Sequence, residues 1–193
     1  NGWVLTNNST PGGLTGWFQG NDGVFPSYSG ADNSYIAGNW LNAGPGGNIS
    51  NWLLTPEVAL VNESTLTFFT RSSGFLADRL EVRMSQNGAS TNVGTTDSSV
   101  GDFTTLLATL NVVLDPAGYP TDWTQISLTL SGLGDGVTGR LAFRYAVTDT
   151  NANGDYIGID SFFLRVPEPG TLALLITGLL GVAVSRRSRV LKR

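Results

Sequence analysis

The chain has 193 residues, of which 40% are hydrophobic and only 13% are charged, against about 25% charged in an average soluble domain. It contains 25 glycines but no cysteine and no histidine, which excludes disulfide bonds, thiolate or imidazole metal sites, and Ser-His-Asp or Cys-His catalysis. The net charge of −4 conceals an asymmetry, because the sequence before Ser185 holds only six basic residues against 15 acidic ones. That part of the chain is therefore unsuited to binding nucleic-acid phosphates.

Residues 1–165 are predicted to form β-strands separated by turns rich in Gly, Asn and Asp. Apolar and polar residues alternate at Leu80, Val82 and Met84, and again at the odd-numbered positions of 141–147. No helical periodicity of useful length precedes residue 166. The pattern predicts an all-β fold, an antiparallel β-sandwich of the jelly-roll type. The expected strands are Trp3–Thr6, Ser34–Gly38, Trp52–Leu60, Thr65–Arg71, Arg79–Gln86, Phe103–Asn111, Thr124–Leu130, Arg140–Thr148 and Tyr156–Arg165.

Residues 171–184 form an apolar segment, TLALLITGLLGVAV, which is followed by five basic residues in the last eight positions. The uncharged stretch 170–185 would make a helix of about 24 Å at 1.5 Å per residue. This is shorter than a hydrocarbon core of about 30 Å, but long Arg side chains can reach the interface from within. We expect a single C-terminal transmembrane helix with its basic end in the cytoplasm and the acidic body outside. A buried core helix is the alternative.

A short proline-rich linker, Val166-Pro167-Glu168-Pro169-Gly170, stands directly before the apolar segment. Linker, apolar helix and basic end together resemble the PEP-CTERM sorting signal of Gram-negative bacteria. The resemblance implies that residues 166–193 are a sorting signal in which Pro167, Glu168 and Pro169 are recognised by an exosortase-type membrane enzyme. It further implies anchoring in the inner membrane, removal of the tail, and transfer of residues 1–165 to the cell surface, commonly together with exopolysaccharide.

Five strings in the body go beyond simple alternation. They are Asn33–Asn39, Asn51-Trp52-Leu53-Leu54-Thr55-Pro56, Asp78–Arg83, Asp102-Phe103 and Gly154–Asp160. Their order and spacing resemble the choice-of-anchor J domain, which is related to cleaved-adhesin and MAM-like jelly rolls, and the string 51–56 is the most specific. The resemblance covers nearly all of residues 1–165 and implies a surface-displayed module, adhesive or carbohydrate-binding in some relatives. Such domains usually begin with an extra strand, and the export route requires a signal peptide. Neither is recognisable here, so we expect the sequence to be trimmed or partial.

The loop Asp149-Thr150-Asn151-Ala152-Asn153-Gly154-Asp155 is a candidate calcium site. Asp149, Asn151, Asn153 and Asp155 place oxygen ligands at alternate positions, and Asp160 occupies the twelfth position of an EF-hand-like pattern. The flanking segments are predicted strands, so a plain Gly/Asn-rich loop is the alternative. Related jelly rolls also suggest that Asp160 could bind calcium together with an N-terminal carboxylate.

Trp17, Gln19 and Asn21 form a candidate ligand-binding group, because an amphipathic ring beside amides suits sugar recognition. Trp17 and Phe18 could equally fill one end of the core, as most large aromatic residues do. Trp52 and Trp123, at the starts of predicted strands, are expected in the core.

No pair of acidic residues stands out as catalytic. Glu81 lies on a polar strand face beside Arg79 and Arg83, which suggests charge pairing at the surface. The sequence therefore favours a non-enzymatic exported module with an adhesive or exopolysaccharide-associated role. The alternative is a secreted polysaccharide-active enzyme, a glycoside hydrolase or lyase, on a jelly-roll scaffold.

Overall fold

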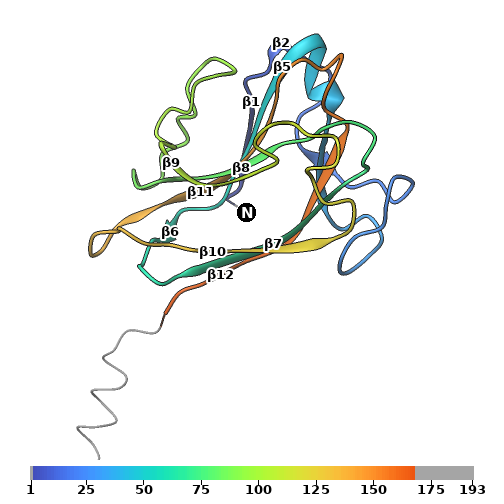
Figure 1. The fold of residues 1–193 in the computed structure, drawn as a ribbon. Coiled ribbons are helices and arrows are strands. Elements are labelled where there is room, and N and C mark those ends of the chain that lie inside the picture. The colour runs from blue at the N-terminus through green and yellow to red at the C-terminus, as the bar shows by residue number, and fades with distance from the viewer. Residues whose placement is uncertain (1, 168–193) are drawn as a thin grey trace, which may run out of the picture.

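A computed structural model describes residues 2–167 as two antiparallel β-sheets packed face to face (Figure 1). One sheet has seven strands, in the order β1-β5-β11-β8-β9, with β2 beside β5 and β6 beside β11. The other has five strands, in the order β10-β7-β12-β4-β3. The all-β sandwich expected from the sequence is confirmed.

The first sheet comprises β1 (Val4–Asn7), β2 (Thr10–Gly12), β5 (Ala43–Leu54), β6 (Val58–Ala59), β8 (Leu80–Ser85), β9 (Thr105–Leu110) and β11 (Thr138–Val147). The second comprises β3 (Phe18–Gln19), β4 (Ile36–Asn39), β7 (Thr65–Ser72), β10 (Thr124–Thr129) and β12 (Tyr156–Arg165). A single 3₁₀ turn, η1 (Trp40–Asn42), joins β4 to β5.

One predicted strand is wrong in its bounds. The segment Trp52–Leu60 was expected to be a single strand, whereas β5 ends at Leu54 and only the two residues of β6 follow. Pro56 interrupts the segment because it has no N–H to donate to a sheet. Conversely, β5 extends back through the Gly-rich residues from Ala43, where β2 pairs with it, whereas β11 pairs with its second half.

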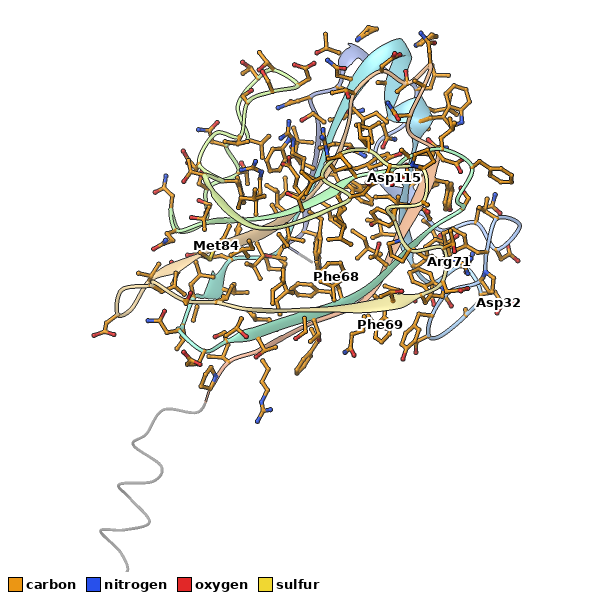
Figure 2. The ribbon with its side chains drawn as sticks, viewed as in Figure 1. Asp32, Phe68, Phe69, Arg71, Met84 and Asp115 are labelled. Atoms are coloured by element: carbon orange, nitrogen blue, oxygen red, sulfur yellow. The ribbon has the colours of Figure 1, made fainter. Side chains whose placement is uncertain are left out.

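Alternating side chains from the two sheets meet to form the main core. Leu80, Val82 and Met84 point inward as predicted, each no more than 1% exposed. Phe68 of β7 meets Phe143 of β11 across the gap, with ring centroids 4.9 Å apart. Figure 2 shows Phe68 between the sheets and Phe69 on the opposite side of β7, which is the period-two alternation of a half-buried strand.

Each sheet also carries a smaller apolar cluster on its outer face. The loop 86–104 covers Trp52 and Leu54 of β5 with Val93 and Phe103. The segment 20–34 covers the outer face of the other sheet, where Phe25 packs among aromatic side chains. Trp52 is fully buried, as expected. Trp123 is half-buried and belongs to the second outer cluster.

Within residues 2–167, no helix has the length and apolar character needed to cross a membrane. The predicted transmembrane segment 171–184 lies outside the described residues.

The inter-sheet core should dominate stability. Phe143→Ala removes a fully buried ring between the sheets and should lower the free energy of unfolding by about 3–5 kcal/mol. Phe163→Ala removes a ring of the same size that is 60% exposed on β12, and should cost less than about 1 kcal/mol. Chemical denaturation measures both, and equal losses would contradict this account of the core.

Candidate functional site

A hollow of about 360 Å³ opens where β4, β7 and β12 meet the loops at one end of the sandwich. We call it the aromatic cleft. Trp40 is 46% exposed and Phe75 is 83% exposed, so two large rings face solvent there. Its polar lining residues include Asn21, Asn39, Ser73 and Asp155.

Trp40 is held by the turn that starts η1. The side chain of Asn39 caps this turn by accepting a hydrogen bond from the N–H of Leu41 at 3.1 Å. The N–H of Trp40 donates to the carbonyl oxygen of Asp155 at 3.0 Å, which ties the turn to the residue before β12. The ring of Trp40 is therefore presented by a backbone that is fixed at two points.

Phe75 is held by the side chain of Asp155. Oδ2 of Asp155 accepts hydrogen bonds from the N–H of Phe75 at 3.0 Å and from the hydroxyl of Ser73. Gly74 between them has a φ of +83°, a conformation that favours glycine and turns the chain back on itself. One carboxylate thus fixes the turn that projects the Phe75 ring.

Asn21 is held by tyrosine hydroxyls of the outer aromatic cluster. Its backbone N–H lies 3.0 Å from the hydroxyl of Tyr156 and 3.1 Å from that of Tyr35. Its side-chain oxygen accepts from the N–H of Gly23 at 2.9 Å. This leaves the side-chain NH₂ group of Asn21 free of hydrogen bonds to the described part of the chain.

Three more polar groups at the cleft have no hydrogen-bond partner among residues 2–167. They are Nδ2 of Asn39, Nε1 of Trp40 and Oδ1 of Asp155. The cleft therefore combines exposed rings, which can stack on apolar faces, with amide donors and one carboxylate acceptor. This mixture can hold a molecule whose hydroxyl groups both donate and accept.

Asp78 supports the cleft from inside the core. Its Oδ1 accepts from the N–H of Asp155 at 2.8 Å and from the hydroxyl of buried Tyr145, whereas Oδ2 is buried without a partner among the described residues. Burial raises the pKa of Asp78 from 3.8 to about 7, although the hydrogen bonds from Tyr145 and Asp155 oppose this effect.

The structure separates the predicted ligand-binding group of Trp17, Gln19 and Asn21. Trp17 is only 5% exposed, donates to the carbonyl of Asn51 and packs beside Tyr145. The prediction that it lies in the ligand site is wrong, and its alternative place in the core is correct. Gln19 lines a different, mainly apolar cavity of about 430 Å³ between the edges of the two sheets. Asn21 alone lies at the aromatic cleft.

The five candidate calcium ligands do not all share one position, because Asp160 lies apart from the loop 149–155. Asp149 accepts from the N–H of Asn151 within its own loop, and the side-chain NH₂ of Asn153 donates to the carbonyl of Thr148. Asp155 binds Ser73 and Phe75 instead, as described above. Because Asp160 lies five residues further along β12, it is about 16 Å away from Asp155, too far to share an ion.

Asp160 does not have the surroundings expected of a cation ligand. Its Oδ2 accepts from the backbone N–H groups of Tyr28 and Ser29 at 2.8 and 3.1 Å. Oδ1 accepts from the hydroxyl of Ser161. Donors around a carboxylate satisfy its charge, so Asp160 anchors the segment 20–34 to the sheet. Within residues 2–167, no three acidic residues come together as a metal-binding group.

Glu81 pairs with Arg83 at 2.7 Å and with Arg144 at 3.0 Å. The predicted partner Arg79 instead donates to the carbonyl of Ala146. Burial tends to raise the pKa of Glu81, but the two guanidinium groups outweigh it and the pKa is lowered. Glu81 is therefore neutralised in a structural network, which does not suit a catalytic acid.

Sequence reasoning missed Trp40, Asn39, Phe75 and Asp78. Asn39-Trp40 carried a usable signal, since an Asn followed by a short turn is a common cap. The exposure of Phe75 depends on Asp155, which is 80 residues away in sequence. No local pattern could have revealed that contact.

Comparison with known protein families identifies a motif at the C-terminal end of the sequence. A family model described as the PEP-CTERM protein-sorting motif matches residues 165–187. The chain carries a PEP-CTERM sorting motif. Of the three residues expected to be recognised, Pro167 is described, and Glu168 and Pro169 lie outside the described residues. The PEP-CTERM motif begins at Arg165, which is the last residue of β12.

The body of the chain has the fold of cleaved adhesin domains, as the sequence resemblance implied. The K1 cleaved adhesin domain of Lys-gingipain from Porphyromonas gingivalis W83 superposes with a TM-score of 0.59 at 20% identity, covering 86% of this chain and 92% of that one. The K3 domain gives 0.54 at 17% identity, over the same shares. These identities establish the fold alone.

A carbohydrate-binding module of the β-sandwich superfamily, from a study of promiscuous specificity, gives a TM-score of 0.51 at 14% identity. The alignment covers 86% of this chain and 57% of that one. No curated protein sequence gives a significant match.

Asp78 should make stability depend on pH. A carboxyl with a raised pKa binds its proton more tightly in the folded state, so the contribution is present at low pH and is lost as pH rises from about 4 to about 7. Asp78→Asn keeps an acceptor for Tyr145 and Asp155 but cannot ionise. Its melting temperature should fall less between pH 4.5 and 7.5 than that of the wild type.

The matched control is Asp135→Asn, an exposed acid in the loop before β11, which should keep the wild-type slope. If Asp78→Asn shows the wild-type pH dependence as well, Asp78 is not the group that titrates.

Proposed function

We propose that this protein is an exported, non-enzymatic module that is displayed on the bacterial surface and binds a glycan in the aromatic cleft. The observation that carries the binding role is the cleft itself. Trp40 and Phe75 expose their rings beside the free amides of Asn21 and Asn39 and the free carboxylate oxygen of Asp155. Two large rings that face solvent within one hollow form an apolar patch of the kind that marks a ligand-binding groove.

The chemistry of the cleft matches a sugar better than it matches a peptide. Sugar rings carry an apolar C–H face, which stacks on an aromatic ring, and a rim of hydroxyl groups, which both donate and accept. The cleft offers the two rings, NH₂ donors and an acceptor within a single hollow. The similarity of the fold to a carbohydrate-binding module is consistent with this role.

Export is the second part of the proposal, and the PEP-CTERM motif supports it. An exosortase-type enzyme would recognise Pro167, Glu168 and Pro169, remove the tail, and release the body to the surface of a Gram-negative cell. The glycan would then be an exopolysaccharide or another surface polysaccharide. The apolar segment 171–184 would hold the protein in the inner membrane until that cleavage.

A catalytic role fits the cleft less well. Glycoside hydrolysis needs two carboxyl groups that both reach the substrate. Asp155 lines the cleft, but its nearest acidic neighbour in the hydrogen-bond network, Asp78, is fully buried behind it. A carboxyl that the substrate cannot touch supports the fold and does not donate a proton to a leaving group.

The cleft is tested by Trp40→Ala and Phe75→Ala. Loss of a central aromatic contact costs about 1–2 kcal/mol, so each variant should bind about tenfold more weakly to whichever polysaccharides a panel of immobilised bacterial and plant glycans identifies for the wild type. Phe163→Ala is the control, since this exposed ring lies on β12 far from the cleft. Unchanged binding by both cleft variants would place the glycan site elsewhere, and a wholly negative panel would overturn the glycan-binding role.

Processing is tested by Glu168→Ala in the native cell. Removing the central residue of the motif should leave the protein in the membrane fraction with its tail intact. The wild type should instead reach the surface with a new C-terminus near residues 167–169. Mass spectrometry of the surface fraction locates that terminus, with Asp135→Ala as the control for loss of an acidic residue. An intact Arg193 on wild-type surface protein would rule out processing.

A further inference from the structure

The charge of the cleft points to the class of glycan. Among the described residues, its lining contains one carboxylate, that of Asp155, and no Lys or Arg. An Asp side chain ordinarily carries a negative charge at neutral pH. Any ligand seated between the two rings must therefore share the hollow with a negative charge that no lining cation balances.

The carboxylate of Asp155 cannot rotate out of the cleft, because hydrogen bonds hold it. The carbonyl of Asp155 accepts from the N–H of Trp40, and its own N–H donates to buried Asp78. Oδ2 is held by Ser73 and Phe75. With its backbone and one carboxylate oxygen fixed, the side chain can offer only Oδ1 to a ligand. The carboxylate is therefore held in a fixed position in the cleft wall.

The other polar groups of the cleft do not neutralise the negative charge of Asp155. The NH₂ groups of Asn21 and Asn39 and the indole N–H of Trp40 are neutral donors, and hydrogen bonds between neutral groups are about half as strong as those involving an ion. A hydroxyl can donate to Oδ1 of Asp155 while accepting from an amide. A uronate, sulfate or phosphate group has only acceptors to present and would meet like charge.

Building on the proposed function, we infer that the aromatic cleft selects an uncharged sugar residue, and that Asp155 excludes acidic glycans from it. The ring of the sugar stacks on Trp40 or Phe75, and one of its hydroxyl groups donates to Oδ1 of Asp155. Asp155 is then the specificity-determining residue, whereas the aromatic rings supply affinity to any sugar.

The test compares one polysaccharide in two charge states. An acidic glycan that contains uronate residues is used as such and after chemical reduction of its carboxylates to primary alcohols, so that only the charge and not the backbone differs. Binding to the full 193-residue chain in detergent is measured by calorimetry. The reduced, neutral form should bind at least about tenfold more tightly than the acidic form.

Asp155→Asn should narrow that preference to a few-fold, because the charge is lost while one oxygen still accepts from Ser73 and Phe75. Affinity for the neutral form should fall as well, since an NH₂ group replaces the Oδ1 acceptor of the sugar hydroxyl, so the ratio of the two affinities is the quantity compared. Asp149→Asn is the matched control. It removes the same charge from the same loop, at an exposed residue that does not line the cleft, and should leave the preference unchanged. Should Asp155→Asn fold poorly, the salt dependence of the wild type serves instead. Raising the ionic strength should weaken discrimination, since a charge at a solvent-open site is screened.

Equal or tighter binding of the acidic form by the wild type would overturn the inference about charge and leave glycan binding intact. An equal effect of Asp149→Asn would also overturn it, since overall charge rather than Asp155 would then be responsible. If the protein bound neither charge state of the glycan and no neutral glycan on the panel, the proposed glycan-binding function itself would be refuted.

Discussion

The placement of β12 determines most of what this domain presents to its surroundings. Alternate residues of this strand face opposite sides of the sheet. Ile157 and Ile159 are buried in the inter-sheet core, and Tyr156 is buried in the outer aromatic cluster. Gly158 is required between them, because a Cβ there would lie 2.9 Å from ring atoms of Trp123 and Tyr35. A larger residue would push the segment 20–34 off the sheet, and that segment carries Asn21 to the cleft.

The sequence predicted the sandwich because strands such as β7 and β8 alternate between buried and partly exposed positions. Leu80, Val82 and Met84 could be assigned to the core from their spacing alone. The Gly-rich first half of β5 could not, since its partner β2 lies more than 30 residues earlier in the chain. Strands of two or three residues, such as β3 and β6, carry no periodicity and are visible only once their neighbours are placed.

The functional site was harder to predict, because exposure is a property of the packed molecule. Trp17 stood in a Gly-rich stretch and was assigned to a ligand site, but it enters the core beside Tyr145. Trp40 follows a strand and gave no sign that its ring would face solvent. Asp155 was singled out from the sequence as a calcium ligand. Its contacts with Ser73 and Phe75, more than 75 residues earlier in sequence, give it a different role.

The proposed glycan-binding cleft and the sorting motif lie at opposite ends of β12. The strand starts beside the aromatic cleft at Tyr156 and ends at Arg165, where the sorting motif begins, nine residues and about 30 Å further on. An apolar segment that starts a few residues later would bring the Arg165 end of the sandwich close to the membrane. The cleft would then face away from the bilayer, open to polysaccharide outside the membrane. Because no cleft residue lies near the motif, cleavage of the tail would release a domain whose binding site was already complete.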